Sequence, residues 1–162
     1  GIDRVTHGRL SELPDDPWAG STWRYDWRMF LEHAGARRVH REVGTEVTLK
    51  IKVRVREALP RLVLGYMIKD RLGQQIFGTN THHTGNPLLG LKAGDEAEFR
   101  FSFPLNLGPG SYSVTTALTS NETHLSENYE WRDLAFVFVV MNVNRNEFVG
   151  TSWLEPRVEI NR

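Results

Sequence analysis

The sequence predicts an all-β fold in which two antiparallel sheets pack face to face. Short runs of alternating apolar and polar residues recur along the 162-residue chain, and Gly, Pro and Asp turns separate them. No segment shows the period of 3.6 residues that marks an amphipathic helix. Seven to nine short strands of this kind are typical of an immunoglobulin-like sandwich, with a jelly roll as the alternative.

The first half of the chain begins with an arm and continues into strands. Residues 1–22 mix Pro, Gly, Asp and Ser without a sustained period, so they are interpreted as a linker or arm ahead of a sandwich domain over 23–162. A strand is expected over 25–32 and a short segment over 37–42. The clearest strand spans 46–56, where five apolar residues alternate with polar ones: Val47, Leu49, Ile51, Val53 and Val55.

A hairpin is expected over residues 63–81. After Pro60 closes the preceding run, an apolar strand leads into a charged turn around Gly73, and a second strand ends in Phe77-Gly78-Thr79-Asn80-Thr81. Further strands are expected over 96–103, from Pro109-Gly110 to Thr119, and over 134–143. The segments 88–95 and 120–130 are expected to be loops, and one more β-like piece is expected over 148–160.

The outer faces of these strands differ in chemistry. Strands 46–56 and 96–103 present charges of both signs, as a solvated sheet does. The other strands present small and apolar residues, which something should cover because soluble domains rarely expose a large apolar patch. The alternatives are the chain's own arm or tail, a dimer partner, and a ligand groove. The residues concerned are Val63, Gly65, Met67, Ser113, Thr115, Ala117, Thr119, Ala135, Val137, Val139 and Met141.

Composition excludes several classes of protein. Twenty Lys and Arg balance twenty Asp and Glu, which argues against a nucleic-acid partner. The chain has no cysteine, so disulfides and thiolate metal sites are excluded. No apolar run approaches the roughly 20 residues that a membrane-spanning helix needs.

Motifs for catalysis and for cofactors are missing from the sequence. There is no G-x-x-x-x-G-K-[ST] phosphate loop and no G-x-S-x-G nucleophile elbow, so no enzyme activity is expected of this chain. His82 and His83 are the most metal-like pair, but neighbours on a strand point to opposite faces. Neither a metal nor a cofactor is therefore expected.

Candidate ligand residues gather in the polar loops. The segment SNETHLSENYEWR over 120–132 combines amides, a carboxylate and aromatic rings, a mixture that suits sugars, whose hydroxyl edges need planar hydrogen-bonding partners and whose C–H faces stack on rings. Trp131 could equally be a core residue at the end of the sandwich. The candidates for carbohydrate binding are Asn80, His82, His83, His124, Tyr129 and Trp131, with Arg71 and Arg132 as partners for an anionic sugar.

Three motifs resemble a known family. They are Gly65-Tyr66-Met67-Ile68, Asp70-Arg71-Leu72-Gly73 and Phe77 through Thr81. Together with most of residues 25–160, this run resembles the C-terminal domain of the ATPase subunit, of the Wzt type, of O-antigen polysaccharide ABC exporters.

The resemblance implies a function, a location and partners. It implies a non-catalytic cytoplasmic domain at the inner face of the inner membrane, fused behind a nucleotide-binding domain and working with a permease subunit. That domain would bind the modified non-reducing end of a finished O-antigen chain. The resemblance also implies a homodimer that exchanges a C-terminal strand, over 148–160.

Two other readings of the sequence remain open beside carbohydrate recognition. The chain could be a structural dimerisation domain without a glycan ligand. A glycan-processing enzyme is a third, more remote alternative.

Overall fold

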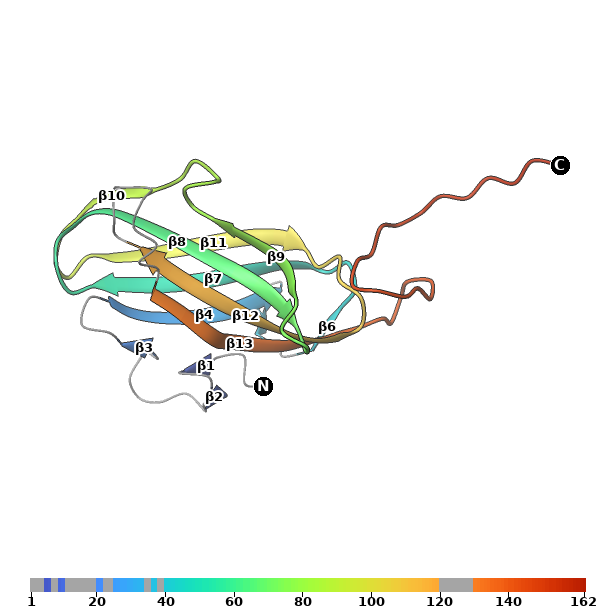
Figure 1. Cartoon of the computed structure of the whole chain (residues 1–162), viewed down its shortest axis with the longest axis horizontal. Helices are drawn as coiled ribbons and strands as arrows, with labels where there is room; N and C mark the ends of the chain where they lie inside the picture. The colour runs from blue at the N-terminus through green and yellow to red at the C-terminus, as the bar shows by residue number, and fades with distance from the viewer. Residues whose placement is uncertain are drawn as a thin grey trace.

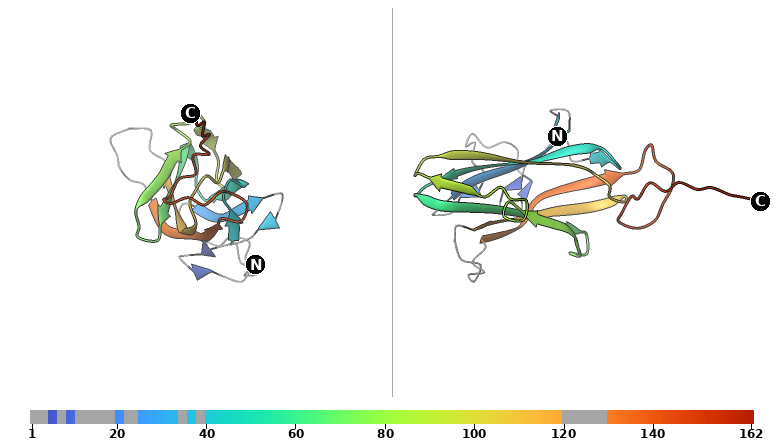
Figure 2. Two further views of the ribbon diagram at one scale, coloured as in Figure 1. Left: turned by 90° about the vertical axis from the view of Figure 1, so that its right-hand side faces the viewer. Right: turned by 90° about the horizontal axis from the view of Figure 1, so that it is seen from above.

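The structure is a sandwich of two β-sheets, seen in a computed structural model (Figure 1). It describes residues 5–6, 9–10, 20–21, 25–33, 36–37, 40–119 and 130–162. The described part of the chain contains strands and turns but no helix. The view from above in Figure 2 shows the two layers one over the other, with the C-terminal residues leaving at one end. The prediction of an all-β sandwich is confirmed.

One layer is built around the long strand β8. Its described strands follow the order β10-β8-β12-β13-β6, and β9 pairs with the second half of β8 on the edge that β10 occupies along the first half. The bounds are β6 (His40–Glu42), β8 (Leu59–Asp70), β9 (Gln75–Asn80), β10 (Leu88–Leu91), β12 (Gly110–Thr119) and β13 (Glu130–Met141).

The other layer is built around β7. Its described strands follow the order β11-β7-β4-β3, with β5 paired to the end of β4. A separate small hairpin, β1-β2, places β1 beside β13 and β4. The bounds are β1 (Val5–Thr6), β2 (Arg9–Leu10), β3 (Gly20–Ser21), β4 (Tyr25–His33), β5 (Ala36–Arg37), β7 (Glu46–Val55) and β11 (Glu96–Pro104).

The core lies between the two layers and follows the alternation of the sequence. The five apolar residues of β7 are all buried, and Tyr112, Val114 and Leu118 of β12 oppose them from the other sheet. Phe136 and Phe138 of β13 are the largest fully buried side chains. Burial of apolar side chains at every second position is the main source of stability for such a sandwich.

Several expected elements differ from the observed ones. The segment 88–91, expected to be a loop, is strand β10, because it finds an antiparallel partner in the first half of β8. Pro60 lies inside β8 and not at the end of β7. A proline is tolerated there because position 60 has no register partner in β10, so no ladder hydrogen bond needs a backbone N–H at this position. Residues 37–42 divide between two sheets, and β6 runs parallel to β13, so the sandwich is not purely antiparallel.

The prediction of one more β-like piece over 148–160 is wrong for this single chain. Residues 142–162 contain no strand. Their first part packs against the sandwich, whereas the rest extends away from it (Figure 1). A strand requires a continuous ladder of backbone hydrogen bonds, whereas the backbone hydrogen bond given for this segment is a single one, from the Trp153 N–H to the Asn106 carbonyl.

The small and apolar outer face is largely covered within one chain. Val63 of β8 is buried, and so are Thr115, Ala117 and Thr119 of β12. Met141, at the end of β13, is exposed. A dimer partner is therefore not required to shield the centre of this face.

Candidate functional site

A groove of about 490 Å³ lies along β8 and β9 on the outer side of their sheet. Its floor is formed where small residues of three strands meet, since Gly65 pairs with Asn80 of β9 on one side and with Ala117 of β12 on the other. None of the lining residues carries a carboxylate. They are Gly65, Tyr66, Met67, Gln75, Ile76, Phe77, Gly78, Thr79, Asn80, His83 and Ala117.

Two glycines allow β8 and β9 to form this floor. A Cβ atom on Gly65 would lie 3.2 Å from the Cβ of Asn80, and one on Gly78 would lie 3.2 Å from the carbonyl oxygen of Tyr66. Both distances are tighter than ordinary van der Waals contact. The glycines of the motif therefore keep the groove open by leaving out a side chain.

The turn after β9 is held by its own hydrogen bonds. The buried Thr81 is tied to β8, because its N–H donates to the Leu64 carbonyl (2.9 Å) and its hydroxyl accepts from the Leu64 N–H (3.1 Å). Asn80 Oδ1 accepts from the His83 N–H at 2.7 Å. Gly85, with a φ of +76°, lets the chain turn back toward β10.

Beside the groove lie His82 and Arg61, which contact each other but are not part of its lining. Arg61 Nη2 donates to His82 Nδ1 at 2.7 Å, because a guanidinium can only donate. The rings of His82 and His83 lie 5.8 Å apart, and His83 lines the groove. Arg61 was not among the candidates predicted from the sequence. No local pattern points to it, since Arg61 and His82 are 21 positions apart in the sequence and only the fold brings them together.

The structure brings together some of the predicted ligand residues and separates others. Asn80 and His83 line the groove, and the ring of His82 lies next to that of His83 without lining it. Arg71 lies in the exposed β8–β9 turn, at the opposite end of β9, and does not line the groove.

The remaining candidates lie in or next to β13. His124 and Tyr129 fall outside the described residues. The backbone of β13 places Trp131 opposite Ala117 and Arg132 opposite Thr116. Trp131 thus occupies the register position next to the floor of the groove.

A second hollow, of about 620 Å³, opens on the other side of β9, between the edges of the two sheets. Tyr66 forms its centre, with ring centroids 4.7 Å from Phe101 and 6.1 Å from both Phe103 and Phe77. Burial raises the pKa of Tyr66 to about 12. The phenol therefore stays neutral at ordinary pH and acts as a packing residue of the aromatic cluster.

A third hollow, of about 420 Å³, lies within the C-terminal segment. Trp153 anchors this segment. Its backbone N–H donates to the Asn106 carbonyl (2.9 Å), and the centroid of its ring lies 4.8 Å from that of Phe148. Gly108 approaches Gly150 so closely that a Cβ atom there would lie 1.8 Å from the Gly150 oxygen. The hydroxyl of Tyr112 donates to the Gly108 carbonyl at 2.7 Å and holds that turn.

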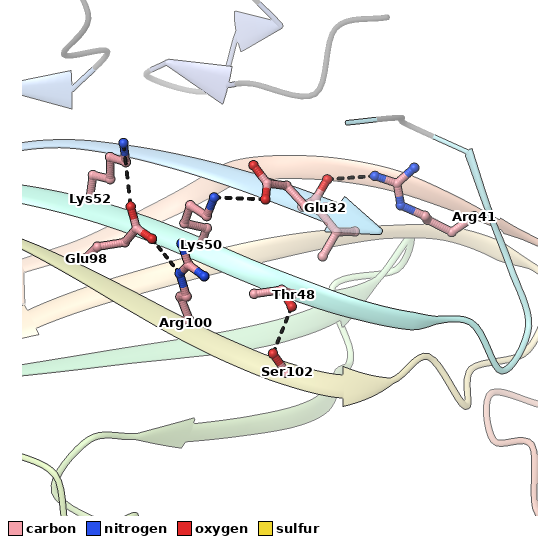
Figure 3. A network of polar contacts seen from close by, with 9 residues as sticks. Glu32, Arg41, Thr48, Lys50, Lys52, Glu98, Arg100 and Ser102 are labelled. Atoms are coloured by element: carbon pink, nitrogen blue, oxygen red, sulfur yellow. Dashed lines mark hydrogen bonds and ion pairs between the residues drawn. The ribbon is translucent and has the colours of Figure 1, made fainter. Parts of the chain in front are cut away.

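The outer face of the β7 layer carries paired charges (Figure 3). Lys50 lies 2.9 Å from Glu32, and Lys52 lies 3.5 Å from Glu98. The hydrogen bond from Arg100 lowers the pKa of Glu98, although the carboxyl is largely solvated. The mixed signs bear out the prediction of a solvated face with cross-strand pairs.

One arginine lies between the layers instead of on this face. The buried Arg41 of β6 donates from Nη2 to the Leu31 carbonyl of β4 at 2.6 Å (Figure 3). Because β6 and β4 belong to different sheets, this hydrogen bond ties the two layers together.

The described residues contain no cluster of three His, Asp or Glu side chains that could hold a metal ion. The same residues include no helix of the length and apolarity needed to cross a bilayer.

Comparison with known proteins gives a consistent picture. A family profile described as the Wzt C-terminal domain matches residues 27–154. The structure resembles a crystal structure of the C-terminal domain of wzt with a TM-score of 0.76 and 20% sequence identity, over 99% of this chain and 98% of that one. No protein with a curated description matches the sequence significantly.

Two other solved structures are more distant. A CARDB domain from Pyrococcus furiosus, solved with di-metal ions, aligns with a TM-score of 0.45 and 15% identity over 80% of this chain and all of that one. A β-glucosidase from Listeria innocua aligns with a TM-score of 0.42 and 12% identity over 80% of this chain and 18% of that one. Neither similarity is close enough to bear on function.

Proposed function

The chain belongs to the Wzt C-terminal domain family, and we propose that it recognises the modified non-reducing end of an O-antigen polysaccharide. Recognition of that end would license export of a finished chain by an ABC transporter. In this role the chain binds the glycan and leaves nucleotide hydrolysis to a nucleotide-binding domain ahead of it, which agrees with the missing phosphate loop.

The groove along β8 and β9 is the observation that carries this proposal. It combines a floor of Gly65, Gly78 and Ala117 with polar groups at one end, Asn80 and His83. A floor without large side chains lets a flat pyranose ring approach the backbone, while the polar end offers hydrogen bonds to its hydroxyls. A sugar exchanges its bonds to water for bonds of similar strength, so we expect weak, water-mediated binding.

Titration by NMR tests the proposal. An oligosaccharide with a modified non-reducing end should shift the backbone amides of residues 64–67 and 76–83 in a saturable manner, and the unmodified oligosaccharide should shift them less. His83→Ala should weaken the binding, because the ring lines the groove and is exposed. His40→Ala is the matched control, since His40 is also exposed but lies on β6 at the far edge of the sheet. Absence of shifts with every modified end would refute glycan recognition at this groove.

We further propose that two copies of the chain associate through their C-terminal residues. The anchor at Trp153 and the close contact of Gly108 with Gly150 hold the segment up to residue 153 on its own sandwich. Beyond the anchor, Leu154, Val158 and Ile160 are almost fully exposed, and the backbone points away from the body (Figure 1). Aliphatic side chains presented on an extended segment suit an exchanged strand that adds to a sheet edge of a partner. The exchanged piece would then be 154–160, shorter than the 148–160 expected from the sequence.

The transporter supplies the wider setting of the proposal. As the C-terminal part of the ATPase subunit, the chain would work in the cytoplasm at the inner face of the inner membrane, next to the permease subunit. There it would meet the glycan end before translocation.

A purely structural dimerisation domain is the second candidate function. The exposed C-terminal residues favour this function, because they suit a dimer contact and a dimer can form without a sugar. The titration separates the two functions: shifts in the groove that depend on the glycan end contradict a purely structural role.

A further inference from the structure

The sandwich is open along the side where β9 and β11 form the edges of the two sheets. Among the described strands, β9 pairs only with β8, and β11 pairs only with β7. The hollow of about 620 Å³ lies between these two edges. An edge strand presents backbone N–H and C=O groups along its outer side, so both rims of the hollow carry hydrogen-bonding groups of the main chain.

The floor of this hollow is aromatic. Phe99, Phe101 and Phe103 alternate along β11 toward the interior, beside the apolar residues of β7. The apolar residues of β7 are buried, whereas the three phenylalanines are only half-buried, and Phe77 of β9 is 52% exposed. The chain thus leaves a row of rings in contact with water, which suits a ligand with an apolar face.

The rims of the hollow are polar, unlike its floor. One rim, from β9 and the turn behind it, offers two hydroxyls and an amide, and the other, from β11, offers an ion pair and a hydroxyl. These residues are Thr79, Thr84 and Asn86 on one side and Glu98, Arg100 and Ser102 on the other. Figure 3 shows the three residues of β11 in a row. A purely apolar occupant would bury these groups without partners, whereas the hydroxyls of a sugar bond to them.

Strand β9 separates the hollow from the groove and supplies side chains to both. Alternation sends Phe77 and Thr79 to the inner side of the sheet, and Gly78 and Asn80 to the outer side. Tyr66, Phe77 and Thr79 belong to the lining of both spaces. A long ligand held in the groove therefore reaches the hollow by crossing one strand.

We propose that the hollow is a second carbohydrate subsite, which binds unmodified sugar units that lie behind the terminal one in the same glycan chain. The inference rests on the proposed function, because the groove would hold the terminal unit. The C–H face of a pyranose packs on the phenylalanine rings, and its hydroxyls bond to the polar rims. A glycan that occupies both spaces binds more tightly than one that occupies the groove alone, since the second contact is made within the same complex.

Fragments of the host cell's own O-polysaccharide test the second subsite. End fragments, of one and of three repeat units, keep the modified non-reducing end, and internal fragments of three units lack it. Binding is followed through the backbone amides of residues 64–67 in the groove and 98–103 in the hollow. The longer end fragment should bind about tenfold more tightly than the shorter one. Internal fragments should shift the amides of 98–103 and leave those of 64–67 unchanged.

Variants assign this advantage of length to the hollow. Phe99→Leu keeps an apolar side chain but removes the flat ring, so the longer end fragment should lose most of its advantage while the shorter one binds as before. Arg100→Ala, at an exposed position of the rim, should remove part of the advantage. Phe148→Leu is the matched control, since Phe148 is also half-buried but lines the third hollow. Matching amide spectra of the free variants verify that each one is folded.

The possible outcomes separate this inference from the proposed function. Equal affinity of the two end fragments without shifts in 98–103 overturns the second subsite, and so does an advantage of length that survives in both Phe99→Leu and Arg100→Ala. Shifts in 98–103 that follow the protein concentration without sugar would assign the hollow to a second copy of the chain instead. In each of these cases, glycan recognition stands if the end fragments still shift residues 64–67. If no fragment shifts either set of amides, both proposals are wrong.

Discussion

Gly65 of β8 and Asn80 of β9 face each other as a pair, and a Cβ atom on Gly65 would lie 3.2 Å from the Cβ of Asn80. The pair sets the depth of the groove, because any side chain at position 65 would fill it. It also explains why the motifs on the two strands of the hairpin belong together. The glycine of the first motif makes room for the asparagine of the second.

Gly65→Val should close the groove and strain the hairpin. Its methyl groups would press on Asn80 and the Thr79 carbonyl, and overpacking of this kind costs about 1–3 kcal/mol of unfolding free energy. Urea unfolding measures the loss, and the glycan titration should show that binding has vanished. Ser111→Val serves as the control at an exposed strand position of β12, with stability near that of the native chain. Unchanged stability and binding in Gly65→Val would contradict the geometry of the groove.

Tyr66 should make stability depend on pH in the alkaline range. Burial raises its pKa to about 12, above the usual value near 10. Between these values the unfolded chain loses the proton while the folded chain keeps it, so stability is full below pH 10 and falls as the pH rises. Between pH 9 and 11 we expect Tyr66 to account for a loss of about 1 kcal/mol.

The comparison with Tyr66→Phe isolates this effect. Phenylalanine keeps the aromatic packing but cannot ionise, so urea unfolding of this variant should fall less steeply with pH than that of the native chain. Parallel pH profiles of the two proteins would show that the Tyr66 phenol is not shielded from solvent.

Lys50 and Lys52 of β7 should contribute unequally to stability. The Lys50–Glu32 pair is mostly buried, with 15% and 14% of the two side chains exposed, whereas the Lys52–Glu98 pair is about twice as exposed. Solvent screening weakens the outer pair, so Lys52→Ala should change the unfolding free energy by less than about 0.5 kcal/mol. Lys50→Ala should cost about 1 kcal/mol, because it also removes packing of the aliphatic stem. Equal effects in thermal or urea unfolding would contradict this ranking.

Removal of residues 154–162 should abolish dimer formation. The chain that ends at Trp153 keeps the hydrogen bond to Asn106 and the contact with Phe148, so the sandwich itself should remain folded. Sedimentation equilibrium should then show a monomer where the full chain gives a dimer. A less drastic variant, Val158→Asp with Ile160→Asp, should weaken the dimer without shortening the chain. Dimers that persist in both variants would place the interface elsewhere.

Strands with a strict period of two were predictable from the sequence alone. The predictions for β7 and β11 agree with the structure to within one or two residues, because each of these strands has one apolar and one polar face. Strand β10 and the parallel pairing of β6 with β13 were not predictable. Each depends on a partner that lies far away in the sequence, and no local pattern encodes that partner.

The candidate site was predictable in part. Asn80, His82 and His83 were selected because they lie at a strand end and carry polar side chains. The structure places Asn80 and His83 in the lining of a groove and the ring of His82 beside that of His83. Arg71, selected for its charge, lies at the wrong end of β9 for that groove. Arg61 was missed, since its relation to His82 arises from strand pairing and not from spacing.

The sequence by itself determined the class of the fold, the inward face of each regular strand and the family motifs of the β8–β9 hairpin. These features are local, because alternation and turn residues act over a few neighbours. Only the tertiary structure decided that Gly65, Asn80 and Ala117 form one floor, that Arg61 reaches His82, and that the chain beyond Trp153 leaves the sandwich. Such relations join residues from separate strands, and they exist only once burial of the core has fixed the register of the sheets.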